Sequence, residues 1–140
     1  MIPMDDRLEV GSVIFEIVYD TRPPKEKYYI ITGFTADSVL LSTVYINSVI
    51  NPNLFPTQAL KDLHVLITES DNPFLRYDSY VDCSFLHEKQ TANVLAAVTS
   101  GDSKFGYVAT VASKCLADIL ATIKSAPTIP AILKKKYGLI

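Results

Sequence analysis

Three basic residues and two tyrosines follow one another closely in the N-terminal part of the chain. They are Arg22, Lys25, Lys27, Tyr28 and Tyr29. A cation beside an aromatic ring can hold a phosphate while a base stacks on the ring, as in sites for single-stranded RNA. The group therefore predicts an RNA-binding lip with Arg22, Lys25 and Tyr28 as contact residues. The same composition is also typical of a solvated hairpin loop whose tyrosines belong to the core.

Other kinds of chemistry have little support in the sequence. It has no Gly-rich phosphate loop, no HExxH, no GxSxG and no Asp-x-Asp cluster. Cys83 and Cys115 lack CxxC or Cys/His spacing, so we expect buried free thiols rather than a zinc or redox site. His64 and His87 are equally isolated, which favours structural or surface imidazoles. We therefore expect neither a metal nor a cofactor.

Length and composition indicate an ordinary folded domain. The chain has 140 residues, of which 49% are apolar and 20% charged, so we expect one domain over residues 1–140. The net charge of −2 gives no global basic field, so a site for a polyanion must be a local patch. No apolar stretch reaches 18 residues and the first residues lack the pattern of a signal peptide, so we expect a cytoplasmic protein without a membrane contact.

The elements that would position the basic lip are mostly strands. Runs rich in β-branched and aromatic residues predict strands at 11–19, 27–34, 38–46, 64–68 and 79–85. The segment 47–62 is expected to be an ordered loop with one helical turn. Apolar residues at helical spacing predict helices over 88–98 and 111–123, while 104–108 is either a connection or a short strand. Strands in the first part of the chain and helices in the second part indicate a barrel or a rolled sheet that is covered by helices.

The C-terminal segment 131–140 is expected to be a last helical turn or an extended tail. It carries the run Lys134, Lys135 and Lys136. Most lysine runs are a solvated face, and the alternative is a contact with RNA or with a protein partner.

The order of the segments resembles the PemK/Kid/MazF family, the toxins of type II toxin–antitoxin systems. The resemblance rests on GSVIFEIVYDTRPPKEKYYIITG, SVLLSTVYINS, DSYVDCSFL and KFGYVATVASKCLADIL, and it spans residues 11–123. In that family a Gly-initiated strand is followed by a basic loop, an Arg-Pro pair opening an apolar strand, and a strand ending in small hydroxyl residues. The resemblance implies a mainly β fold with α, an SH3-like (MazF/Kid-type) small barrel with a C-terminal helix.

The resemblance also implies an activity, which is metal-independent cleavage of single-stranded RNA by a homodimer that a cognate antitoxin protein controls. The ribose 2′-hydroxyl is the nucleophile, so the enzyme must transfer protons and stabilise a phosphorane dianion. Lys27 takes the place of the family's catalytic arginine and would stabilise this charge. Ser48 or Thr43 would donate a hydrogen bond to the phosphoryl oxygen. Gly106 takes the place of the glycine before the last helix.

The sequence departs from the family at this catalytic position. The Arg-Pro pair is replaced by Lys27 and Tyr28, and Pro23 and Pro24 precede the basic residues instead of following them. Lysine lacks the planar fork that holds a phosphate in a bidentate way, although it still offers a point charge. The alternative function is therefore a non-catalytic SH3-like interaction module that binds a protein partner.

Overall fold

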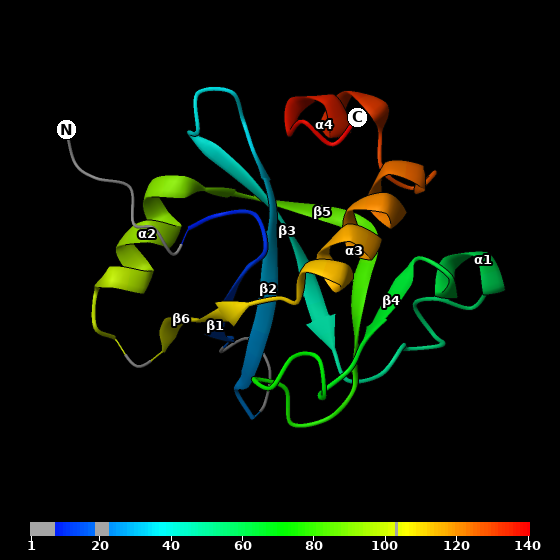
Figure 1. Ribbon diagram of the computed structural model, residues 1–140, viewed down its shortest axis with the longest axis horizontal. Helices are drawn as coiled ribbons and strands as arrows, with labels where there is room; N and C mark the ends of the chain where they lie inside the picture. The colour runs from blue at the N-terminus through cyan, green and yellow to red at the C-terminus, as the bar shows by residue number, and fades with distance from the viewer. Residues whose placement is uncertain (1–7, 19–22, 103) are drawn as a thin grey trace.

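A six-stranded antiparallel sheet forms the centre of the molecule in the computed structural model, which describes residues 8–18, 23–102 and 104–140 (Figure 1). Its strands are β1 (Ser12–Val18), β2 (Lys25–Phe34), β3 (Leu40–Asn47), β4 (His64–Ile67), β5 (Ser79–Gln90) and β6 (Phe105–Thr110). They lie in the order β4-β5-β3-β2-β1-β6, and each neighbouring pair is antiparallel. The described helices are α1 (Gln58–Lys61), α2 (Thr91–Thr99), α3 (Ser113–Ser125) and α4 (Ala131–Lys136).

These elements confirm the expectation of a mainly β fold with helices. The finer expectation of a barrel is not confirmed by the described strands, because β4 and β6 are the two edges of the sheet and no ladder joins them. The sheet is therefore open. Within the described ranges, the longest helix is the 13-residue α3, and no helix has the length and apolar character needed to cross a bilayer.

The change from strand to helix comes later than the sequence predicts. A helix was expected to begin at residue 88, but β5 continues to Gln90 and α2 begins at Thr91. The reason is tertiary, because the end of β5 pairs with the start of β3, with His87 opposite Thr43 and Gln90 opposite Leu40. The segment 104–108, which the sequence left open, contributes residues 105–108 to β6, which pairs with β1.

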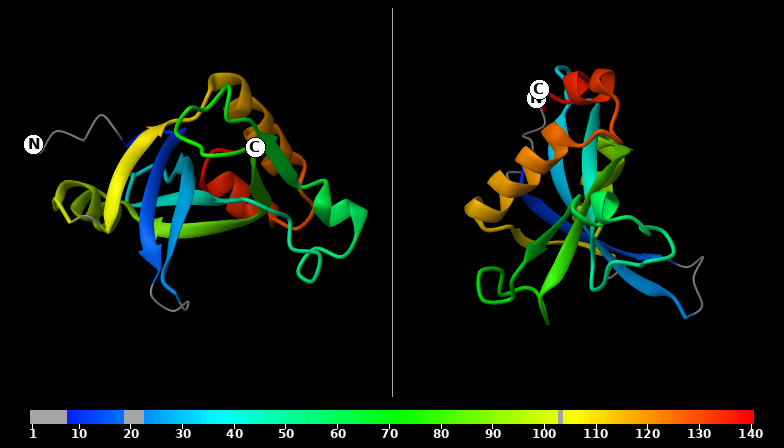
Figure 2. Two further views of the ribbon diagram at one scale, coloured as in Figure 1. Left: turned by 90° about the horizontal axis from the view of Figure 1, so that it is seen from below. Right: turned by 90° about the vertical axis from the view of Figure 1, so that its right-hand side faces the viewer.

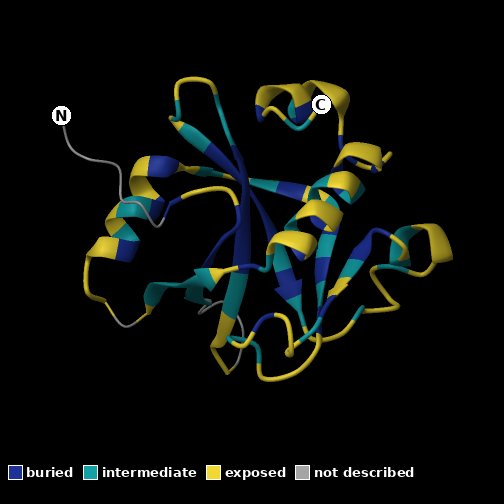
Figure 3. Ribbon diagram, in the orientation of Figure 1, coloured by how far each residue is buried: buried dark blue, intermediate teal, exposed yellow. Residues whose placement is uncertain are grey.

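The sheet has two buried faces because strand side chains alternate in direction. On one face, called the α3 face, Ile30 and Val44 pack with Ile119 of α3. On the other, called the α2 face, Tyr29 and Ile31 pack with residues of α2. Figure 2 shows the two helices at different parts of the coiled sheet, and Figure 3 shows that burial is concentrated in the middle strands. Each large apolar side chain that is fully buried in this way contributes about 1.5–3 kcal/mol.

The C-terminal lysine run is not simply solvated. Lys134 is buried, and its Nζ donates to the carbonyl oxygens of Lys124 and Ala126, each at 2.8 Å. The last carbonyls of α3 are left without partners inside the helix, and the lysine satisfies two carbonyls at this end. Lys135 is exposed, whereas Lys136 forms an ion pair with Glu88 at 2.7 Å. Within the run, the expectation of a solvated face is therefore wrong for Lys134.

The chain after α4 is held against β2 and β5. The hydroxyl of Tyr137 donates to Glu88 Oε2 at 2.6 Å, and the tyrosine is 3% exposed. Gly33 makes this approach possible, since a Cβ atom there would lie 2.7 Å from the backbone oxygen of Tyr137. The C-terminal segment therefore joins the end of α3 to the middle of the sheet.

Candidate functional site

A pocket of about 670 Å³ lies where β2 begins and β3 ends. The segments 48–55 and 74–79 close it from two further sides. Its lining includes apolar side chains such as Ile46, Phe55 and Phe74 beside polar and charged residues. The volume is that of a site for a small molecule or for part of a polymer.

The charged groups of the pocket are mostly cationic. Lys25, Lys27 and Arg76 line it, and Glu26 is the one carboxylate among the described lining residues. In the described part of the chain, no carboxylate lies within ion-pair distance of any of the three cations. Their charge is therefore available to attract an anionic ligand such as a phosphodiester.

Lys27 is held by neutral groups. Its Nζ donates to Asn47 Oδ1 at 3.3 Å and lies 5.9 Å from the centre of the Tyr45 ring. Asn47 is the last residue of β3, and the exposed Ser48 follows it at the wall of the pocket. An amide and an aromatic face orient the ammonium group without neutralising it.

Glu26 and Tyr28 form a pair within β2. They are two residues apart and thus on one face of the strand, and the Tyr28 hydroxyl donates to Glu26 Oε2 at 3.1 Å. Burial, and then the hydrogen bond with Glu26, raise the pKa of Tyr28 above its usual value. The phenol therefore stays protonated at neutral pH and is a hydrogen-bond donor beside a carboxylate.

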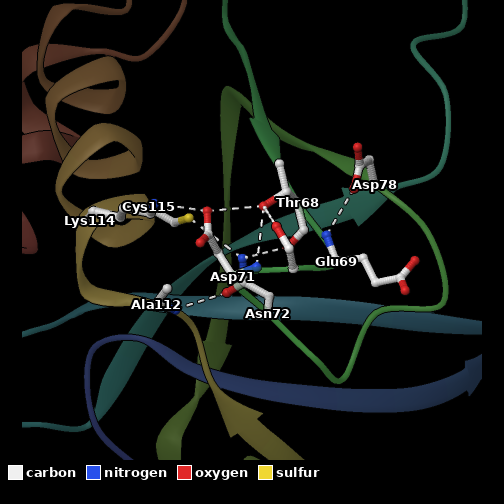
Figure 4. A network of polar contacts seen from close by, with 9 residues as sticks. Thr68, Glu69, Asp71, Asn72, Asp78, Ala112, Lys114 and Cys115 are labelled. Carbon is white, nitrogen blue, oxygen red and sulfur yellow. Dashed lines mark hydrogen bonds and ion pairs between the residues drawn. The ribbon is translucent and has the colours of Figure 1, made fainter.

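The loop 68–78 brings Arg76 and Tyr77 to the pocket, and a polar network holds this loop to the start of α3 (Figure 4). Asn72, which is 2% exposed, donates through Nδ2 to the Thr68 carbonyl at 3.1 Å and to Cys115 Sγ at 3.5 Å. Its Oδ1 accepts from the backbone nitrogen of Ala112 at 2.9 Å.

An ion pair and a backbone contact extend this network. Lys114 Nζ lies 3.0 Å from Asp71 Oδ2, and this lysine, followed by Thr68, lowers the pKa of the Asp71 carboxyl. At the other end of the loop, Asp78 Oδ1 accepts from the backbone nitrogen of Glu69 at 2.9 Å.

Replacing Asn72 should loosen this loop. We expect Asn72→Ala to lower the free energy of unfolding by about 2 kcal/mol, because it removes a buried amide and leaves the Ala112 nitrogen without its acceptor. Urea denaturation followed by circular dichroism measures the change. The exposed Asn53 provides a matched control, and equal stability of Asn72→Ala and Asn53→Ala would show that the network does not hold the loop.

The structure brings together four of the residues that the sequence proposed. Lys25, Lys27, Tyr28 and Ser48 all line the pocket. Arg22 lies outside the described residues.

Thr43 is separate from this group. It is fully buried, does not line the pocket, and donates its hydroxyl to the carbonyl oxygen of His87 at 3.1 Å. Four residues of strand, about 13 Å, separate it from Asn47 at the pocket. Its hydroxyl joins β3 to β5, and we do not assign it to the site.

Three further residues of the pocket were missed in the sequence. Arg76 and Tyr77 repeat the basic-then-aromatic pairing of Lys27 and Tyr28, but they lie in a turn-rich segment whose position the sequence does not reveal. Glu26 stands between two lysines, and a single acidic residue in a basic stretch is no signal of a site. Only the return of the loop 68–78 to the start of β2 shows that these residues share a site.

Gly106, which the resemblance placed before the last helix, lies in β6 opposite Phe15. A Cβ atom at this position would lie 2.6 Å from the Phe15 ring. This glycine therefore allows an aromatic ring to pack across β6.

The sequence also singled out Cys83, Cys115 and His64, and all three are buried. Cys83 and Cys115 are buried free thiols, as expected, and burial raises the pKa of Cys83 to about 12. His64 is buried, with Nδ1 3.0 Å from the Leu60 carbonyl oxygen and Nε2 3.7 Å from Asp82 Oδ1. Across the described ranges, no three His, Cys, Asp or Glu side chains gather as metal ligands do.

Comparison with known proteins adds no further assignment. No protein-family model matches the chain, and no curated protein matches its sequence. Function is therefore inferred from the pocket and its charges.

Proposed function

We propose that the pocket binds single-stranded RNA and cleaves it without a metal ion, as the toxin component of a type II toxin–antitoxin system. The observation that carries the proposal is the convergence of Lys25, Lys27 and Arg76 with Tyr28 and Tyr77 around one pocket. Cations of this kind bind phosphates, and the aromatic rings offer surfaces on which bases stack. None of the three cations is neutralised by a carboxylate in the described part of the chain, so their charge is available to a phosphate.

The proposed reaction is a transesterification within the RNA. The 2′-oxygen attacks the adjacent phosphorus, the bond from phosphorus to the 2′-oxygen forms, and the bond to the 5′-oxygen breaks. The products are a 2′,3′-cyclic phosphate and a 5′-hydroxyl. Lys27 would stabilise the phosphorane dianion as a point charge, and Ser48 would donate a hydrogen bond to a phosphoryl oxygen.

In this scheme the proton of the 2′-hydroxyl leaves to water and the departing 5′-oxygen takes a proton from water, because Glu26 and Tyr28 lie on the face of β2 opposite to the Lys27 ammonium group.

The relation to the PemK/Kid/MazF barrel, a homodimeric state, a cognate antitoxin and a cytoplasmic location belong to the same proposal. The open sheet keeps the order of strands followed by a C-terminal helix on which the resemblance rests. Val49 and Leu54 line the pocket and are 69% and 68% exposed, so they offer apolar surface beside it for a second copy or an antitoxin.

End-group analysis of cleaved RNA tests the proposal. We expect the protein, in a buffer containing EDTA, to cut an end-labelled single-stranded RNA and to leave 2′,3′-cyclic phosphate and 5′-hydroxyl ends. DNA of the same sequence serves as the control and should stay intact, because it lacks the 2′-hydroxyl. Binding of RNA without cleavage would favour the non-catalytic interaction module, and cleavage of the DNA would exclude the 2′-hydroxyl mechanism.

A further inference from the structure

Three aromatic rings form a continuous row on the sheet, outside the lining of the pocket. The rings of Phe85 and His87 on β5 lie 4.7 Å apart at 61°, and His87 stacks on Tyr45 of β3 at 4.0 Å and 11°. Phe85 is 57% exposed, and the other two rings are partly exposed. This aromatic row of Phe85, His87 and Tyr45 therefore ends in a ring that is open to solvent.

Two lysines stand beside the inner end of the row. Lys89 Nζ lies 5.6 Å from the centre of the Tyr45 ring and forms an ion pair with Glu16 at 3.8 Å. Lys27 Nζ lies 5.9 Å from the same ring. Lys27 is also one of the residues that line the pocket.

The central ring of the row is uncharged at neutral pH. Burial and then the nearby Lys89 lower the pKa of His87 below its ordinary value. Asp82 and Lys27 also act on this imidazole, the first raising its pKa and the second lowering it, and both are weaker influences than burial. The neutral imidazole lies between the rings of Tyr45 and Phe85 and adds no positive charge of its own, and the exposed ring of Phe85 is the part of the row that is open to a ligand.

We propose that the aromatic row is a stacking platform for a base of the RNA strand whose phosphate is held at Lys27. The inference rests on the proposed function of the pocket and adds a second contact to it. An exposed ring beside cations is the arrangement that single-stranded RNA sites use, and stacking accepts any base because every base has a π face. With one phosphate at Lys27, the strand would place a neighbouring base against the exposed ring of Phe85.

Charge favours RNA over a protein partner as the ligand of the row. The cation at the junction, Lys27, has no carboxylate partner among the described residues, and it already serves the phosphate-binding pocket. An RNA strand supplies both ligands together, because its phosphates carry the negative charge and its bases are the flat rings.

Fluorescence anisotropy with two labelled probes tests the platform. One probe is a 2′-O-methyl oligouridylate, which cannot be cleaved by the 2′-hydroxyl route, and the other is an abasic strand of the same length and charge. We expect Phe85→Ala to weaken binding of the oligouridylate about tenfold and to leave the abasic strand unchanged, because it removes a stacking partner and no charge. Phe85→Trp should retain the affinity, and Leu66→Ala, at a 51% exposed residue of β4, is the matched control.

The variants separate failure of the platform from failure of the pocket. Lys27→Ala should weaken binding of both probes, since it removes a phosphate contact. If Lys27→Ala weakens binding and Phe85→Ala does not, the platform is overturned and the pocket stands. Equal weakening of both probes by Phe85→Ala would exclude stacking. If neither the wild type nor any variant binds RNA, both proposals are overturned. If Phe85→Ala binds RNA as the wild type does but no longer forms a dimer in light scattering, the row is a contact between two copies of the chain.

Discussion

Lys27→Ala is expected to lower the rate of RNA cleavage about a hundredfold, which corresponds to about 3 kcal/mol of transition-state stabilisation. The ammonium group donates to Asn47, the last residue of β3, and it is oriented by Asn47 and Tyr45 rather than neutralised. Its interaction with the substrate should strengthen as the phosphorane becomes a dianion. Loss of this group should therefore affect the chemical step more than binding. Single-turnover cleavage of a labelled single-stranded RNA measures the effect.

Lys27→Arg distinguishes catalysis from general electrostatic attraction. Arginine keeps the charge and adds a bidentate donor, so we expect activity to be kept or raised. The exposed Lys135 on α4 provides a control of the same charge, and Lys135→Ala should cleave at the wild-type rate. Circular dichroism checks that each variant is folded. Equal rates for wild type, Lys27→Ala and Lys27→Arg would remove Lys27 from the mechanism.

Lys134→Met is expected to lower the free energy of unfolding by about 3 kcal/mol. The variant removes two charge-assisted hydrogen bonds, each 2.8 Å long, from the carbonyls of Lys124 and Ala126. Methionine keeps much of the volume of the buried chain but leaves both oxygens without this donor. Methionine costs less free energy to bury than a charged lysine, and this difference offsets part of the loss. The expected decrease in stability is therefore smaller than the full contribution of two such hydrogen bonds.

Urea denaturation of Lys134→Met and Lys135→Met measures this difference. Lys135 is the neighbouring residue of the same helix and is exposed, so its replacement should change stability by less than about 0.5 kcal/mol. Gly33→Ala tests the same segment from the opposite side, because its Cβ atom would lie 2.7 Å from the Tyr137 oxygen and should displace the C-terminal segment. Similar stability of the two lysine variants would mean that Lys134 does not secure the end of α3.

The short-range pattern of the sequence determined most of the elements. Runs of β-branched and aromatic residues predicted the strands that became β1 to β5, and apolar residues at helical spacing predicted α3. Both signals arise within a few residues of chain, because they reflect the local fit of side chains to a strand or to a helix of about 3.6 residues per turn. The basic and aromatic residues around Lys27 were likewise visible as neighbours in sequence, and the structure places four of the proposed residues in one pocket.

Only the tertiary structure decided which segments meet. β5 extends to Gln90 because β3 pairs with it, and no local pattern contains that partner. Arg76 reaches the pocket because Asn72 holds the loop 68–78 to the start of α3, 40 residues further along the chain. Lys134 turns inward because the carbonyls at the end of α3 need donors, although a run of three lysines is typical of an exposed face. Backbone carbonyls that need hydrogen-bond donors and strands that need pairing partners find them far away in the sequence. These long-range contacts can outweigh the local preference of a segment for helix, strand or exposure when the chain folds.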